Sequence, residues 1–137
     1  MANDVVLNKS ASIERCLQRI REECAGDTQN LVANQTKQDA IILNLQRACE
    51  TSIDLAMYVV SQRKLGVPQD SRDAFSLLQT GGILPADLAQ RMQRVVGFRN
   101  VAIHEYARLN LDVVHAIITK QLDDFCTFSS TIVKACA

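Results

Sequence analysis

Apolar residues recur at spacings of three and four along most of this sequence, and they do not alternate with polar residues over a useful length. This spacing gathers apolar side chains on one side of an α-helix, whereas alternation would indicate a β-strand. Glycine and proline interrupt the pattern at Gly66, Pro68, Gly81, Gly82 and Pro85. Helices with short connections, and no sheet, are therefore predicted.

Five helices are expected from these patterns and their interruptions. They cover residues 13–24, 31–65, 71–80, 85–106 and 111–132. The third is the short one, and Asp70 and Ser71 are the residues expected to cap its start. A chain of 137 residues suits one domain, residues 1–137. The predicted fold is an all-α, up-and-down bundle of four main helices and one short helix.

Charge and cysteine content narrow the classes of function. Fifteen Lys and Arg residues balance fifteen Asp and Glu residues, so a chain-wide positive field that binds nucleic acid non-specifically is not expected. The five cysteines form an odd set without a CxxC pair, which indicates reduced thiols. The first residues lack the features of a secretion signal, and no apolar run is long enough for a membrane span. The expectation is a cytoplasmic protein without membrane association.

One helix breaks its own pattern. Extending the apolar stripe of the fourth helix in steps of four and three reaches Leu88, Met92, Val95, Arg99, Ala102 and Tyr106. A guanidinium keeps its charge, and leaving its donors bare in a packed seam costs several kcal/mol. Arg99 therefore needs a partner, which is a carboxylate of this chain, a second copy of the protein, or a phosphate.

Other polar residues gather near Arg99. Asn100 and His104 are four residues apart, so they lie one above the other on a helix, and Asn100 can orient the imidazole. Residues 91–108 contain four arginines and one glutamate, a local net charge of +3. Three of these arginines are further candidates for contacts with RNA: Arg91, Arg94 and Arg108.

This combination of side chains suits RNA cleavage. An imidazole transfers protons near neutral pH, and an arginine holds a phosphate and stabilises the charge that grows on it. The ribose 2′-hydroxyl is an internal nucleophile, so no metal or cofactor is expected, and the product would be a 2′,3′-cyclic phosphate. The alternative from spacing alone is structural: His104 is a satisfied histidine at the end of a helix, and Arg99 pairs with an acid such as Asp54 or Asp112.

The segment from Phe98 to Tyr106 resembles the R-x4-H-x-Y signature of the HepT-like toxins of the HEPN superfamily, which are small helical ribonucleases. The order of other landmarks is similar too, from Asp73 through Pro85 to the Gly97 that precedes the motif. The resemblance covers nearly the whole chain.

The resemblance implies roles for the motif residues. Arg99 and His104 would be the catalytic pair, and Asn100 would support them. Family members are homodimers whose two motifs face each other in a composite site, with tRNA as one suggested target. Their antitoxin is an MNT-type nucleotidyltransferase that transfers AMP onto the motif tyrosine, here Tyr106. The added negative charge would occupy the anion site and repel RNA.

Two other functions stay open at this stage. The chain could be a non-catalytic helical partner of a nucleotidyltransferase that binds a nucleotide or substrate, with Arg99 on a phosphate. It could also be a structural dimerisation bundle whose polar seam fixes register, in which case leucine at Arg99 and Tyr106 would tighten the dimer.

Overall fold

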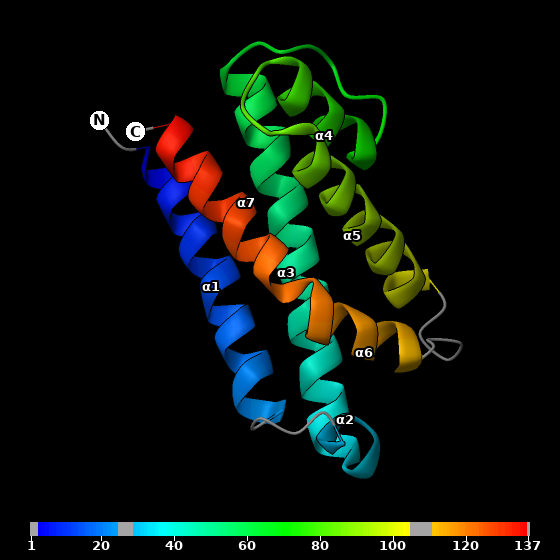
Figure 1. Ribbon diagram of the computed structural model, residues 1–137. Helices are drawn as coiled ribbons and strands as arrows, with labels where there is room; N and C mark the ends of the chain where they lie inside the picture. The colour runs from blue at the N-terminus through cyan, green and yellow to red at the C-terminus, as the bar shows by residue number, and fades with distance from the viewer. Residues whose placement is uncertain (1–2, 25–28, 105–110, 137) are drawn as a thin grey trace.

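The computed structural model describes residues 3–24, 29–104 and 111–136, and for residues 30, 32 and 102–104 it describes the backbone only. The described residues form seven helices and no strand (Figure 1). The helices are α1 (Asp4–Cys24), α2 (Asn30–Ala33), α3 (Gln35–Gln62), α4 (Ser71–Thr80), α5 (Ala86–His104), α6 (Leu111–Lys120) and α7 (Leu122–Ala135). The predicted all-helical class is confirmed. No helix in these ranges is long and apolar enough to cross a membrane.

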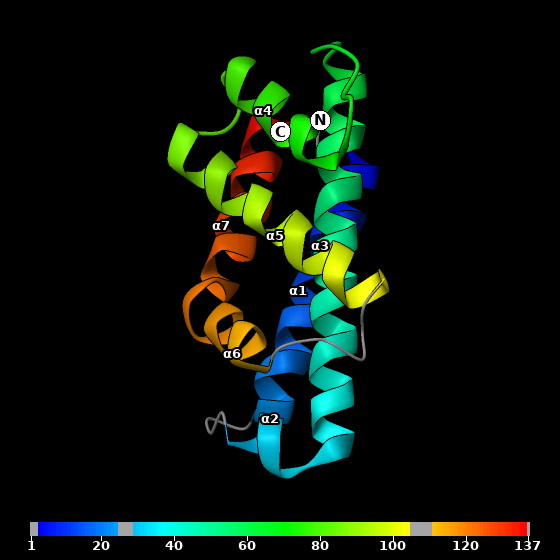
Figure 2. The same cartoon turned by 90° about the vertical axis from the view of Figure 1, so that its right-hand side faces the viewer.

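The long helix α3 is the centre of the molecule. It packs along α1, which runs in the opposite direction, and α7 lies against α1, with the start of α1 and the end of α7 at the same end of the molecule (Figure 1). On another side of α3, α5 crosses it obliquely (Figure 2). The buried residues of α3 form two neighbouring stripes, as its sequence predicts. Burial of each large aliphatic side chain stabilises the fold by about 1.5–3 kcal/mol. Because the apolar residues of α3 cover much of its circumference, neighbouring helices pack on several sides of it.

The helix predicted over residues 31–65 is in fact divided at Asn34. This residue is extended, with φ −134° and ψ 112°, and its side chain accepts a hydrogen bond from the Lys37 N–H. Asparagine is among the best residues for starting a helix because its side chain binds an otherwise unpaired backbone N–H. The long helix therefore begins at Gln35, after the short α2, and it ends at Gln62.

The helix predicted over residues 111–132 is also two helices, which meet at Gln121. The bend is local, because Gln121 has φ −120° and ψ −4° while its N–H still bonds to the Ile117 carbonyl at 2.8 Å. The two halves have different neighbours: α7 packs on α1, α3 and α5, whereas α6 packs on α2. One straight helix could not contact both sets of neighbours. The apolar spacing nevertheless continues through the bend without interruption.

The pair α4 and α5 positions the candidate site. Asp70 caps α4, since its Oδ1 accepts a hydrogen bond from the Asp73 N–H at 2.8 Å. Gln93 of α5 then ties the two helices together, because its Nε2 donates to Ser76 Oγ at 2.7 Å and to the Arg72 carbonyl at 3.1 Å. These bonds fix the first turn of α4 against the middle of α5.

Candidate active site

Arg99 lies where the sequence pattern places it, on the side of α5 that faces the core. Met92, Val95 and Val96 on this side are all at least 96% buried, and Arg99 itself is half-buried. The prediction of a cation in the apolar seam of this helix is confirmed. The guanidinium needs partners in this position, because its charge is costly in an apolar environment.

The described residues provide hydrogen-bond acceptors for only some of the N–H groups of Arg99. Its Nη2 donates a hydrogen bond to Ser71 Oγ at 3.1 Å. Its Nε is buried and has no hydrogen-bond acceptor among them. The alternative pairing with Asp54 or Asp112 is wrong, since Arg99 forms no ion pair with any described residue. An unsatisfied buried donor costs about 1–3 kcal/mol, so the site is arranged for an acceptor from outside this part of the chain.

A pocket of about 300 Å³ opens beside this guanidinium. It is lined by the first turn of α4 and by α5, through Asp70, Ser71, Arg72, Val96, Arg99 and Asn100. The described residues that line it include two arginines and one carboxylate, which together carry a net positive charge. Ser71 and Arg72 were missed by sequence reasoning, because they lie about thirty residues before the motif and no local pattern connects the two segments.

The remaining motif residues are only partly described. Asn100 is exposed and lines the pocket, next to Arg99. His104 is the last residue of α5, and its side chain lies outside the described part of the structure. Tyr106 and Arg108 lie outside the described residues altogether. The pairing of Asn100 with His104 therefore stays a prediction, supported by the continuous helix that carries both residues.

Arg91 and Arg94 differ in their surroundings. Arg91 is held by two carboxylates, through Nε to Asp124 Oδ1 at 2.8 Å and Nη1 to Asp87 Oδ2 at 3.2 Å. The hydrogen bond from Arg91 also holds the pKa of the Asp87 carboxyl below its ordinary value. A contact of Arg91 with RNA would compete with both bonds. Arg94 is exposed and lies at the edge of a second pocket.

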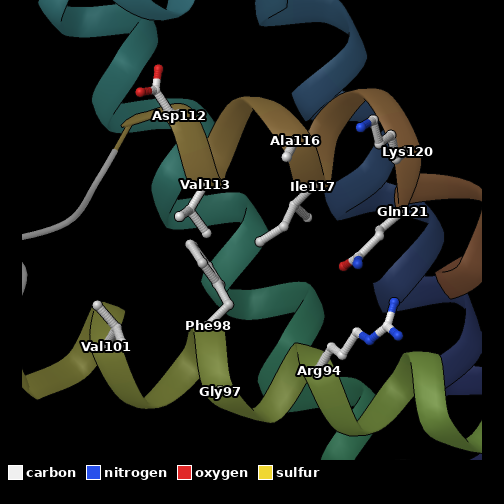
Figure 3. Close-up of a pocket in the computed structure, with 10 residues that line it drawn as sticks. All are labelled: Arg94, Gly97, Phe98, Val101, Asp112, Val113, Ala116, Ile117, Lys120 and Gln121. Carbon is white, nitrogen blue, oxygen red and sulfur yellow. The ribbon is translucent and has the colours of Figure 1, made fainter.

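This second pocket, of about 700 Å³, lies between α5 and α6 (Figure 3). Its walls are mainly apolar, and Phe98 of α5 points toward Ile117 and Val113 of α6. Val101 and Val113 on its walls are 39% and 48% exposed. Arg94 and Gln121 point toward each other at one end, and Asp112 lies at the opposite end (Figure 3). Nothing in the sequence indicated this pocket, because it depends on how α6 turns away from α7.

The cysteines do not supply a nucleophile to the site. No disulfide joins any of the five cysteines in the described structure, as expected. Cys49 is near enough to Arg99 for its charge to act on it, but burial, assisted by Glu50, raises the pKa of the Cys49 thiol far above its ordinary value. The thiolate is the reactive form, so Cys49 is an inert core residue.

The chemistry available at the first pocket is therefore that of anion binding. A guanidinium offers donors in a planar fork that fits a phosphate, and it holds its charge at any physiological pH. Arg99 has spare donor capacity, and the imidazole that its helix carries at its end is suited to proton transfer. This arrangement fits a phosphodiester better than an uncharged substrate.

Comparison with known proteins agrees with this geometry. The sequence matches the family model for ribonuclease HepT-like proteins over residues 13–132. It is 42% identical over 130 residues to the mRNA nuclease HepT of Shewanella oneidensis, covering 95% of this chain and 97% of that protein.

Two solved structures are similar over almost the full length. One, a crystal structure of a toxin-antitoxin with AMP-PNP, contains a chain of 41% identity and TM-score 0.90, covering 97% of this chain and 99% of that one. The other, the tri-AMPylated Shewanella oneidensis HEPN toxin in complex with MNT antitoxin, has 42% identity and TM-score 0.88, covering 97% and 98%. The resemblance predicted from the R-x4-H-x-Y motif is thereby confirmed, and the chain belongs to the ribonuclease HepT-like family.

Proposed function

We propose that this protein is a ribonuclease toxin that cleaves RNA without a metal ion, at a site formed by Arg99, His104 and Asn100. The observation that carries the proposal is the half-buried Arg99, whose Nε has no acceptor among the described residues beside a positively charged pocket. The relative named mRNA nuclease HepT supports the same activity. That name points to mRNA as a substrate, whereas the motif resemblance suggested tRNA. An RNA substrate would place its action in the cytoplasm.

The reaction follows from the chemistry of RNA. The ribose 2′-oxygen attacks the neighbouring phosphorus and loses its proton, and the bond from phosphorus to the 5′-oxygen breaks. The leaving 5′-oxygen takes a proton, and a 2′,3′-cyclic phosphate remains on the other fragment. Arg99 holds the phosphate and stabilises its growing negative charge, His104 transfers the proton, and Asn100 orients His104.

The direct test is cleavage of purified mRNA and tRNA in the presence of a strong chelator. We expect the parent to yield fragments ending in 2′,3′-cyclic phosphate, and His104→Ala to lose about 10²- to 10⁴-fold in rate. His115→Ala is the matched control, since the chain has only these two histidines, and it should cleave as the parent does. Cleavage that requires a divalent ion would contradict the mechanism, and saturable nucleotide binding without cleavage would favour a binding partner.

The proposal includes a homodimer formed over the pocket between α5 and α6. Val101 and Val113 leave apolar surface exposed there. Arg94 and Lys120 lie toward one end of this pocket, and Asp112 lies at the other (Figure 3). A two-fold axis through this surface would pair the exposed apolar side chains of one protomer with those of its copy. The end of α5, with its motif, would then face the partner.

Val113→Glu tests the dimer. A carboxylate in an apolar contact carries a large desolvation cost, so we expect the variant to elute as a folded monomer in size-exclusion chromatography and to lose cleavage. Val67→Glu is the control, because Val67 is 80% exposed on the connection between α3 and α4. A dimeric, active Val113→Glu protein would contradict this interface.

We propose that the cognate antitoxin is an MNT-type nucleotidyltransferase that transfers AMP to Tyr106. The structural relative in a tri-AMPylated state and in complex with MNT antitoxin supports this assignment. In the transfer, the tyrosine oxygen forms a bond to the α-phosphorus of ATP, and pyrophosphate leaves. Each added unit brings a negative charge to the region of Arg99 and His104, where it would compete with RNA.

Intact mass of the toxin incubated with antitoxin and ATP measures this modification. We expect the parent to gain whole AMP units and lose cleavage, and Tyr106→Phe to gain none and stay active. The only other tyrosine provides the control: Tyr58 lies in α3 and hydrogen-bonds Asn3 at 2.9 Å, so Tyr58→Phe should be modified normally. AMP units on Tyr106→Phe would place the acceptor elsewhere.

A further inference from the structure

Arg72 is a second arginine at the Arg99 pocket, and it comes from a different helix. It is the second residue of α4, it is exposed, and it lines the pocket together with Arg99 and Asn100. Its Nη2 lies 3.2 Å from the point that a Cβ on Gly97 would occupy. The Arg72 guanidinium therefore reaches across from α4 to the surface of α5, half a turn before Arg99.

The backbone of Arg72, and not its side chain, makes the hydrogen bond that holds this residue against α5. The Arg72 carbonyl accepts a hydrogen bond from Gln93 Nε2 at 3.1 Å, and the same nitrogen donates to Ser76 Oγ at 2.7 Å. The neighbouring Ser71 accepts the hydrogen bond from Arg99. The start of α4 is thus fixed on α5 by residues that leave the Arg72 guanidinium available for another group.

The positive charges of Arg72 and Arg99 favour the binding of an anion at this pocket. Neither Arg72 nor Arg99 forms an ion pair with any residue in the described ranges. Among the described residues that line the pocket, the only carboxylate is that of Asp70, which caps α4 through the Asp73 N–H. Both arginines line this small pocket, so an anion bound at it would lower the repulsion between their charges.

We propose that Arg72 binds the RNA backbone beside Arg99, at a phosphodiester next to the reacting one that Arg99 holds. This inference rests on the proposed function, and it adds a substrate-binding residue that lies outside the motif. Gly97 is part of the arrangement, because a Cβ at this position would lie only 3.2 Å from the Arg72 Nη2. Arg72 binds substrate and transition state equally, so it sets KM, whereas Arg99 and His104 set kcat.

Steady-state cleavage of a defined RNA tests this assignment. We expect Arg72→Ala and Arg72→Gln to raise KM about tenfold with kcat unchanged, since a hydrogen bond to a charged group is lost. In an inactive His104→Ala background, the slope of log binding constant against log salt should fall in magnitude by about 0.7, the value for one phosphate contact to a single strand. Arg47→Ala, at an exposed arginine of α3 outside both pockets, should change neither quantity.

Gly97→Ala separates a binding role from a structural one. A Cβ at this position presses on the Arg72 guanidinium, which must shift, while alanine favours the helix more than glycine does. We expect a higher Tm together with a higher KM, in a protein that size-exclusion chromatography shows to be as dimeric as the parent, since Gly97 also lines the pocket between α5 and α6. A purely structural role for this contact predicts that KM stays at the parent value as Tm rises.

The outcomes distinguish the two proposals. If the parent does not cleave RNA, the proposed function is wrong whatever Arg72 does. If the parent cleaves and folded Arg72→Ala and Arg72→Gln keep its KM and salt slope, the inference about Arg72 is wrong and the proposed function stands. If kcat falls and KM does not change, Arg72 acts in the chemical step, and the assignment as a binding residue is overturned.

Discussion

Arg99→Leu should abolish RNA cleavage and leave the protein folded with a Tm at or above that of the parent. Activity falls by about 10³-fold or more, because the charge that grows on the phosphate loses its stabilising group. Stability does not fall, because leucine fits the apolar side of α5 and removes a buried Nε that lacks an acceptor. Loss of activity without loss of stability is typical of a functional residue that interrupts an apolar seam.

Two variants complete the Arg99 experiment. Arg99→Lys keeps the charge but not the planar fork, so we expect it to recover only a small part of the activity. Arg47→Leu is the control for removing one exposed arginine, at a position of α3 outside both pockets. A leucine variant that cleaves RNA and inhibits growth as strongly as the parent would support the structural dimerisation bundle instead.

Phe128→Ala should cost about 3–5 kcal/mol of the free energy of unfolding, which is a large part of the 5–15 kcal/mol typical of a domain. Phe128 of α7 is fully buried, and its ring packs edge-to-face on Phe75 of α4, with centroids 5.6 Å apart and an interplanar angle of 69°. The cavity would loosen α4, which carries Ser71 and Arg72. Urea unfolding of the parent and the variant measures the change.

The control for this cavity is Thr127→Ala, at the exposed neighbouring position, which should change stability by less than about 0.5 kcal/mol. The double variant with Phe75→Ala isolates the ring contact, for which we expect a coupling of about 0.5–1.5 kcal/mol. A Phe128→Ala protein as stable as the parent would mean that this aromatic pair does not hold α4 in place.

Helix boundaries were predictable where a local signal sets them. Asp70 caps α4 and Gly81 follows its last residue, as expected from the sequence, because a cap depends on residues three or four apart. The break at Asn34 has the same kind of signal, an asparagine that binds the Lys37 N–H, but the apolar spacing around it concealed the break. The bend at Gln121 has no such signal, since it arises from the different neighbours of α6 and α7.

The sequence by itself determined that this chain is helical, that a cation lies on the apolar side of α5, and that Asn100 and His104 share a helix with it. These properties depend on the helical repeat, which relates residues only a few positions apart. Only the tertiary structure decided that Ser71 accepts the Arg99 hydrogen bond, that Arg72 lies over Gly97, and that Asp54 and Asp112 form no ion pair with Arg99. These contacts join helices far apart in the chain, and their partners are set by how whole helices pack, which no local spacing encodes.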